Sequence, residues 1–214
     1  MNIKSKQITC AIIFHILFST IMTVAQTAYQ SDLETIRMKD QALRMLVMPG
    51  GCIEKTYGRD SKEYKYFISL MIQEDMKNLE QVVKIIEENG WLGISQVGKI
   101  ANNALFLVIQ HASVEIQEKY FPLLKESAEK GESALADMAL MDDRIRMRRK
   151  IKQLYGSQTV NIEGKTYVWP IEDPQNVDER RKGVQLPPLA DYLKLMGLSY
   201  PHNELPADSD AAPK

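Results

Sequence analysis

The chain has 214 residues, 44% of them hydrophobic, and its 27 basic and 28 acidic side chains leave a formal net charge of −1. This balance gives no electrostatic case for nucleic acid as a partner, because nucleic-acid-binding domains carry an excess of basic charge. The length suits one domain of ordinary size, and the sequence contains no internal repeat.

Residues 1–25 have the pattern of a signal peptide. Two lysines precede an apolar run over residues 8–22, and residues 23–25 offer a small-residue cleavage site. A membrane anchor is the alternative, but the run is shorter than the roughly 20 residues that a span needs, and His15 interrupts it. We therefore expect cleavage after Ala25, with Ala28 as the alternative site. We also expect export to the periplasm or the medium, and no stable membrane span in the mature chain.

Cleavage would change the charge and the cysteine count. It would leave 25 basic and 28 acidic side chains, a formal net charge of −3. Cys52 would be the remaining cysteine, so no intramolecular disulfide could form in spite of an oxidising destination. The stability of the mature protein is therefore expected to come from an apolar core.

The mature sequence predicts a mainly α single domain over residues 31–197. Apolar residues at three- and four-residue spacing, together with caps, glycines and prolines, indicate about six helices. They are expected over residues 31–48, 61–89, 114–130 and 133–152, in the segment that carries His111, and in short segments after residues 173 and 188. Ser61 is the expected cap of the helix over residues 61–89.

Two residues interrupt the predicted helices, and one segment departs from helical periodicity. Gly98 is expected to mark the close approach of another backbone, and Pro122 a kink or a split. Residues 158–169 predict a small β-hairpin with a glycine turn, whereas residues 55–60 read as a polar loop. The tail, residues 198–214, is rich in proline, alanine and acidic residues, and we expect it to be disordered.

Three predicted helices place polar side chains within the apolar stripe. Asp40 and Arg44 lie in the stripe of the first helix, His111 in that of another, and Asp143 in a third. A buried polar group without a partner costs roughly 1 to 3 kcal/mol, and a charge costs more. These side chains are therefore expected to be satisfied by one another or by a ligand, which suggests a convergent polar site.

His111 is the histidine available to the core once residues 1–25 are removed, since His202 lies in the tail. A neighbouring carboxylate such as Asp143 or Asp40 could make it a general base. The alternative is a core histidine that is bonded to a backbone carbonyl. Glu172 could add a second carboxylate for acid or base chemistry.

Structural alternatives also exist for the other charged residues. Asp143 and Arg144 could form an inter-helix salt bridge, and Asp40 and Arg44, one turn apart, could pair with each other. A zinc site is poorly supported because the core offers one histidine and one thiol.

Short blocks of sequence resemble a bacterial family catalogued as domain of unknown function 6624. The resemblance spans about residues 33–193 and is carried by Asp40-Gln41 with Arg44, Gly90-Trp91 with Val97-Gly98, Gln110-His111-Ala112, Asp143-Arg144, Gln153 with Tyr155-Gly156-Ser157-Gln158, Pro170-Ile171-Glu172-Asp173-Pro174, and Val177-Asp178-Glu179-Arg180-Arg181. The chain departs from the family pattern at Leu92 and at residues 183–186. The family has no established activity to transfer, so the resemblance implies a fold and the location of a site.

The leading hypothesis is an exported helical protein with a small-molecule site, with hydrolysis as its candidate chemistry. The candidate catalytic residues are His111, Asp143 and Glu172. The candidate ligand-binding residues are Asp40, Arg44, Gln110, Arg144, Tyr155, Arg180 and Arg181. The arginines would hold a small anionic ligand.

Two other hypotheses stay open. In one, the protein is a noncatalytic binding or interaction module of the cell envelope, and its buried polar network is structural. In the other, the protein depends on a metal that Asp40, His111, Asp143 and Glu172 would hold. This hypothesis is weaker than the first two, and we predict no metal site. The sequence does not decide whether the protein is an enzyme, and it names no substrate, cofactor or oligomeric state.

Overall fold

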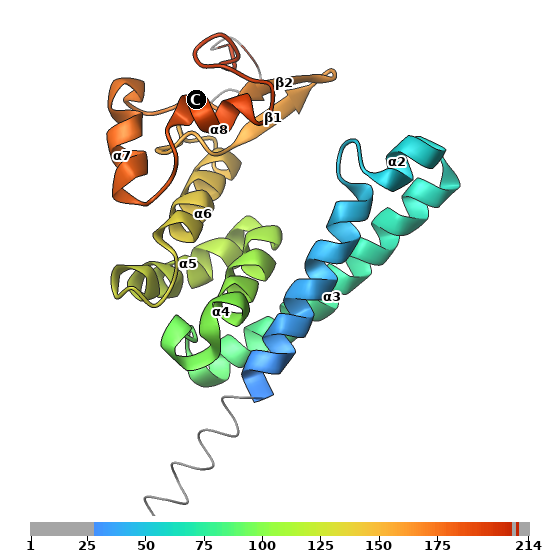
Figure 1. Cartoon of the computed structure of the whole chain (residues 1–214), viewed down its shortest axis with the longest axis vertical. Helices are drawn as coiled ribbons and strands as arrows, with labels where there is room; N and C mark the ends of the chain where they lie inside the picture. Colours follow the sequence, from blue (N-terminus) through green and yellow to red (C-terminus); the bar gives the residue numbers. More distant parts are fainter. Residues whose placement is uncertain (1–27, 207–208, 210–214) are drawn as a thin grey trace, which may run out of the picture. The chain divides into compact units, whose positions relative to one another are not determined.

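The structure is a computed structural model that describes residues 28–206 and residue 209. The predicted signal peptide, residues 1–25, and residues 207–208 and 210–214 of the predicted tail lie outside this part of the chain. The described residues are mainly helical, with one two-stranded antiparallel hairpin near the C-terminus, which confirms the predicted fold class (Figure 1). No helix in this part of the chain has the length and hydropathy to cross a membrane.

The chain divides into two compact units, Met1–Leu105 and Phe106–Lys214. The predicted limits of one domain over residues 31–197 stay a prediction. In the first unit, a helix over residues 28–47 runs alongside α3 (Lys62–Asn89), and α2 (Cys52–Tyr57) lies between them in the sequence (Figure 1).

The start of α3 follows from its capping residue. The Oγ of Ser61 accepts a hydrogen bond from the backbone N–H of Tyr64 at 3.0 Å, which confirms Ser61 as the cap. The helix ends at Gly90, whose positive φ of 73° is typical of a helix C-terminus.

Helix α2 was not predicted, because its six residues show no helical periodicity. The carboxylate of Glu54 accepts a hydrogen bond from the backbone N–H of Gly50 at 2.8 Å and one from the Nε of Arg59 at 2.7 Å. These contacts connect the two ends of the turn, so part of the predicted polar loop is helical.

Buried apolar side chains supply the core of the first unit. They come from the helix over residues 28–47, from α3 and from the start of α4 (Ile94–His111), and include Leu33, Ile36, Val47, Val82, Ile85, Ile86, Val97 and Ala101. These are the positions that the three- and four-residue spacing indicates.

Gly98 interrupts α4 with non-helical angles, φ 79° and ψ 164°. A Cβ atom added there would lie 3.8 Å from the Nε2 of Gln30, an ordinary van der Waals contact. The predicted close approach of another backbone is therefore wrong. The positive φ, which side chains with a Cβ adopt rarely, is the reason for a glycine.

The second unit is built from the end of α4, further helices and the hairpin. Its elements are α5 (Val114–Glu129), α6 (Leu135–Arg148), β1 (Thr159–Ile162), β2 (Lys165–Val168), the 3₁₀ turn η1 (Pro174–Asn176), α7 (Val177–Gly183) and α8 (Leu189–Lys194). Helix α5 is one element that includes Pro122. Helix α6 ends earlier than predicted, since Lys150 has a left-handed φ of 57°.

The hairpin confirms the predicted strands, and it also pairs with part of the predicted tail. Thr159 lies opposite Val168 in an antiparallel register. The backbone N–H of Val168 donates to the carbonyl of Asn203 at 2.7 Å, and that of Leu205 donates to the carbonyl of Val168 at 3.0 Å. Leu205 is buried beside Trp169. Residues 198–205 are thus packed, where disorder was expected, because β2 offers them its second edge.

Candidate functional site

Many hydrogen bonds hold the loop over residues 153–158 of the second unit, here called the anchored loop. Asp143 on α6, with no exposed surface, accepts hydrogen bonds from the backbone N–H groups of Leu154 at 2.7 Å, Tyr155 at 3.0 Å and Ser157 at 3.0 Å. The Oγ of Ser157 donates a fourth at 2.8 Å. Four donors match the roughly four lone-pair sites of a carboxylate.

Two opposing effects act on the Asp143 carboxylate. Its burial disfavours the charged form and raises the pKa of Asp143 above the ordinary value of an aspartate. The hydrogen bonds from Ser157, Tyr155 and Leu154 act in the opposite direction. The carboxylate is therefore costly to bury, and the anchored loop supplies the compensating donors.

Two glutamines close the anchored loop at its ends. The Nε2 of the fully buried Gln153 donates to the carbonyls of Gln158 at 3.1 Å and Trp169 at 2.6 Å. Its Oε1 accepts the backbone N–H of Gln158 at 2.8 Å. The backbone of Gln153 also exchanges hydrogen bonds with Pro170 and Glu172 at the exit of the hairpin. The loop is therefore tied to the segment that follows β2.

Gly156 is required at the centre of the anchored loop. Its φ is 72°, in the left-handed region. A Cβ atom there would lie 2.7 Å from the Cδ1 of Leu189 and 3.0 Å from the Cδ1 of Ile171. Both the backbone conformation and the neighbouring side chains thus exclude a larger residue.

The two adjacent arginines of α7 hold the carbonyl side of the anchored loop. The Nε of Arg180 donates to the carbonyl of Leu154 at 2.9 Å. The Nη1 of Arg181 donates to the carbonyl of Tyr155 at 2.5 Å. The same two loop residues give their N–H groups to Asp143, so acidic and basic side chains hold opposite sides of one short backbone segment.

Each of these arginines also reaches a second segment. The Nη2 of Arg180 donates to the carbonyls of Glu172 at 2.6 Å and Asp173 at 2.8 Å. The Nε of Arg181 donates to the carbonyl of Pro187 at 2.6 Å. The two guanidinium groups therefore join the anchored loop to the segments on both sides of α7.

Arg181 is a fully buried charge. Its guanidinium carbon lies 4.9 Å from the centre of the Tyr192 ring, and its Nη2 has no hydrogen-bond partner within the described residues. Burial lowers the pKa of Arg181. The hydroxyl of Tyr192 donates to the carbonyl of Ser157 at 3.1 Å, so the ring that covers the arginine also fixes the loop.

The carbonyls on either side of His111 are held as well. The Nη1 of Arg144 donates to the carbonyl of Gln110 at 3.3 Å, and the Nε2 of Gln117 donates to the same oxygen at 2.6 Å. The Nη1 of Arg148 donates to the carbonyl of Ala112 at 2.5 Å. His111 itself is half-buried at the last residue of α4 and has an interaction partner.

Arg144 connects the His111 segment to the anchored loop. Its Nε donates to the Oε1 of Gln158 at 3.2 Å, while its Nη1 reaches the carbonyl of Gln110. The predicted site residues Gln110, Arg144 and Asp143 are thus part of one hydrogen-bonded framework around α6. Their contacts include backbone carbonyls, backbone N–H groups, the hydroxyl of Ser157 and the amide side chain of Gln158.

Glu172 and Tyr155 lie at the margin of this framework. Glu172 is exposed, and its carboxylate forms an ion pair with Arg146 at 3.3 Å. Tyr155 is half-buried, and burial raises the pKa of its phenol, as do the nearby carboxylates of Asp142 and Asp143. Both side chains are therefore more accessible than Asp143.

Asp40 and Arg44 belong to the first unit, where they pair as predicted. The Nη2 of Arg44 lies 3.2 Å from the Oδ1 of Asp40 and 2.7 Å from the Oδ1 of Asp75 on α3. Asp40 is 2% exposed. Burial raises the pKa of Asp75, and Arg44 opposes that shift. The arginine therefore joins the helix over residues 28–47 to α3.

Sequence reasoning missed several members of these clusters. Gln153, Ser157 and Gln158 belong to the motif blocks of the sequence but are not among the predicted site residues, and neither is Asp75. The sequence feature that could have indicated the three loop residues is the run of polar residues over 153–158. Helical periodicity does not apply to this run, because the segment is a loop. No cluster of three or more His, Cys, Asp or Glu side chains suited to a metal ion occurs in the part of the chain that the structure describes.

Comparison with known proteins gives one match. No curated protein and no solved structure matches the chain. A family model described as "Family of unknown function (DUF6624)" matches residues 28–203, which is most of the chain. The protein therefore belongs to the DUF6624 family.

Proposed function

We propose that the protein is a noncatalytic binding module of the cell envelope, in which the buried polar residues of the second unit are structural. One observation carries the proposal: four donors of the anchored loop occupy the carboxylate of Asp143. A carboxylate in that state has no lone pair left to orient a histidine or to bind a ligand.

The arginines support the same proposal. Arg180 and Arg181 direct their N–H groups to backbone carbonyls, and Arg144 joins a carbonyl to an amide side chain. The Nε and Nη2 of Arg180 already donate to backbone carbonyls, so this guanidinium gains less from an anion than one that faces an open site. The small anionic ligand expected from the sequence stays a prediction.

A hydrolytic site centred on His111 and Asp143 is the alternative. In its favour, Arg144, Arg148 and Gln117 hold the carbonyls on both sides of His111, and catalysis depends on such fixed placement. Its weakness is the general base, because His111 would need a carboxylate other than Asp143 to orient it.

The placement in the cell envelope rests on the sequence of residues 1–25. The basic residues, the apolar run and the small-residue cleavage site are typical of exported proteins. Fractionation of cells that express the full chain tests this part of the proposal. A full-length product in the cytosolic fraction would contradict it, whereas a processed product outside the cytosol is expected.

The absence of catalysis is tested with ester, phosphate-ester and peptide probes on the wild type and on His111→Ala. We expect neither protein to exceed the rate in buffer. Hydrolysis by the wild type that His111→Ala abolishes, with an unchanged unfolding midpoint, would refute the noncatalytic function. Thermal unfolding of both proteins provides the control for folding.

A further inference from the structure

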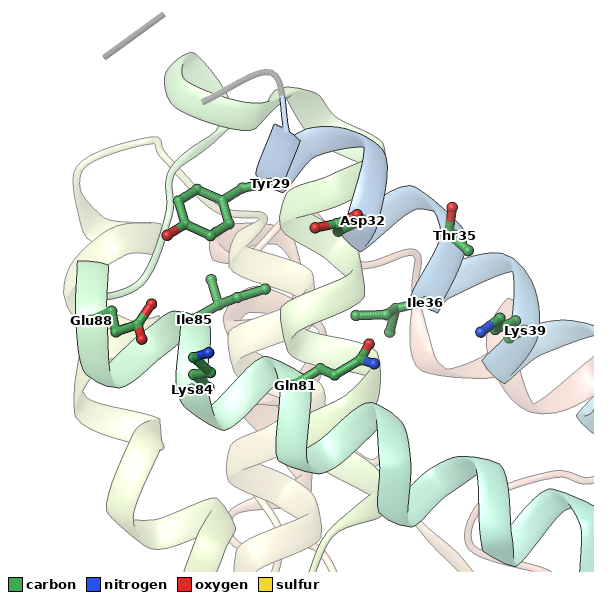
Figure 2. Close-up of a pocket in the computed structure, with 9 residues that line it drawn as sticks. All are labelled: Tyr29, Asp32, Thr35, Ile36, Lys39, Gln81, Lys84, Ile85 and Glu88. Carbon is green, nitrogen blue, oxygen red and sulfur yellow. The ribbon is translucent and has the colours of Figure 1, made fainter. Parts of the chain in front are cut away.

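A cleft with a volume of about 450 Å³ lies in the first unit, between the helix over residues 28–47 and α3 (Figure 2). The helix over residues 28–47 contributes Tyr29, Asp32, Thr35, Ile36 and Lys39, and α3 contributes Gln81, Lys84, Ile85 and Glu88. This volume falls within the range of roughly 300 to 1,000 Å³ that is typical of small-molecule sites.

The cleft has an apolar base. Ile36 is 2% exposed and Ile85 is 7% exposed, and each comes from one of the two helices. The lining residues recur every three or four positions, so they lie on the facing sides of the two helices. An apolar part of a ligand could therefore be removed from water against the two isoleucines.

Charges of both signs surround this base. Asp32, Lys84 and Glu88 line the cleft, and their side chains have no hydrogen-bond or ion-pair partner among the described residues. Lys84 and Glu88 are one helical turn apart, but the lysine comes first, which is the less favourable order for such a pair. Their charges are therefore available to a ligand.

The charges are also distributed along the cleft. Figure 2 shows the ring of Tyr29, the carboxylate of Glu88 and the ammonium of Lys84 toward one end, with Asp32 nearer the middle. Lys39 lies at the other end, where it forms an ion pair with Glu74 at 3.4 Å. A carboxylate beside an aromatic ring suits an ammonium group. A lysine without an ion-pair partner, as at Lys84, suits a carboxylate.

We infer that this cleft binds a small zwitterion with an apolar body, of the class of a hydrophobic dipeptide. The ammonium group lies between Tyr29, Asp32 and Glu88, the carboxylate lies against Lys84, and the apolar side chain covers the isoleucine base. This inference names a ligand class for the proposed binding module and therefore rests on that function.

The first experiment titrates the purified chain with the dipeptide alanyl-leucine and follows backbone amide signals by nuclear magnetic resonance. Saturable shifts are expected at residues 29–39 and 81–88. N-acetyl-alanyl-leucine lacks the ammonium group, and alanyl-leucine amide lacks the carboxylate. Each is expected to bind at least about fivefold more weakly, since one charge contact is worth on the order of 1 kcal/mol.

Two variants connect each charge of the ligand to one side chain. Glu88→Gln should weaken alanyl-leucine at least about fivefold and bind the N-acetyl form as well as the free dipeptide. Lys84→Met should also weaken alanyl-leucine at least about fivefold, and it should bind alanyl-leucine amide as well as it binds the free dipeptide. Glu80→Gln is the matched control, because Glu80 is an exposed residue of α3 outside the cleft lining. This variant should bind alanyl-leucine with the affinity of the wild type.

The results separate the two proposals. The cleft assignment is overturned if no saturable shift appears at residues 29–39 and 81–88 up to about 10 mM dipeptide, or if both cleft variants bind like Glu80→Gln. The same spectra report whether the dipeptide stays intact. Cleavage of the dipeptide would refute the noncatalytic function and leave the cleft assignment standing, provided that the shifts saturate in the cleft.

Discussion

Asp143→Asn should destabilise the second unit more than any other single removal of a charge on α6. The substitution keeps the size of the side chain but replaces one acceptor oxygen with an NH₂ group. Two of the four donors that now reach Asp143 would then face a donor. The Ser157 hydroxyl can rotate away, whereas a backbone N–H cannot, so at least one buried N–H would lose its partner.

The magnitude follows from these contacts. Losing hydrogen bonds to a charged acceptor costs about 1.5 to 3 kcal/mol each, and an unsatisfied buried N–H costs about 1 to 3 kcal/mol. Removing a buried charge offsets part of this loss, because burial raises the pKa of Asp143. We expect a net loss of about 2 to 4 kcal/mol in the free energy of unfolding at neutral pH.

Urea unfolding, read by the fluorescence of the buried Trp169 in a Trp91→Phe background, measures this loss, because the chain has two tryptophans and Trp169 belongs to the second unit. With a slope of about 2 kcal/mol per molar urea, the midpoint should fall by roughly 1 to 2 M. Hydrogen exchange should show faster exchange at the amides of Leu154, Tyr155 and Ser157.

Asp142→Asn is the matched control, because Asp142 is the preceding residue of α6 and pairs with Arg146 at 2.9 Å one turn away. Such a pair contributes about 0.3 to 0.5 kcal/mol. The reasoning is refuted if Asp143→Asn costs no more than Asp142→Asn, or if the loop amides stay protected in Asp143→Asn.

Further predictions concern Gly156 and Tyr200. Gly156→Ala should cost about 2 to 4 kcal/mol of unfolding free energy, because its Cβ would meet Leu189 and its φ is positive. Gly183→Ala is the control and should be neutral or stabilising, because the space around Gly183 is open. Equal urea midpoints of the two variants would contradict this prediction. Burial, with a hydrogen bond to Glu204, raises the pKa of Tyr200 to about 12. The folded state then retains a proton that the unfolded chain loses above pH about 10, so the stabilisation is complete below pH 10 and is lost as the pH rises through 12. The unfolding free energy of the wild type should fall relative to Tyr200→Phe over that interval, and a constant difference would show that Tyr200 is not responsible.

Much of the secondary structure could be predicted because its causes are local. The spacing of apolar residues located the long helices, Ser61 marked the start of α3, and the glycine turn located the hairpin. The helix α2 could not be predicted in this way, since contacts of Glu54 with residues outside the helix stabilise it.

The order of residues 198–205 has a similar explanation. Their composition is typical of a disordered tail, and nothing within the segment predicts a regular structure. The edge of β2 supplies the missing partners, since Val168 exchanges backbone hydrogen bonds with Asn203 and Leu205. A sequence pattern cannot show a free strand edge that only the folded hairpin creates.

For the buried polar residues, the sequence predicted the burial but not the hydrogen-bond partners. The helical stripe alone placed Asp40 and Asp143 in the interior, where they are 2% and 0% exposed, because burial follows from periodicity. Their partners could not be read from the stripe. Asp143 is held by a loop 11 to 14 residues downstream, and Arg44 reaches Asp75, 31 residues away.

The sequence by itself therefore determined the long helices and the burial of Asp40 and Asp143, since both properties depend on residues three or four positions apart. The tertiary structure decided which groups satisfy those charges, since hydrogen-bond partners come from segments that meet only after packing. Asp143, Arg180 and Arg181 bind the backbone of one loop in the folded protein. The cleft of the first unit is therefore our proposed ligand site.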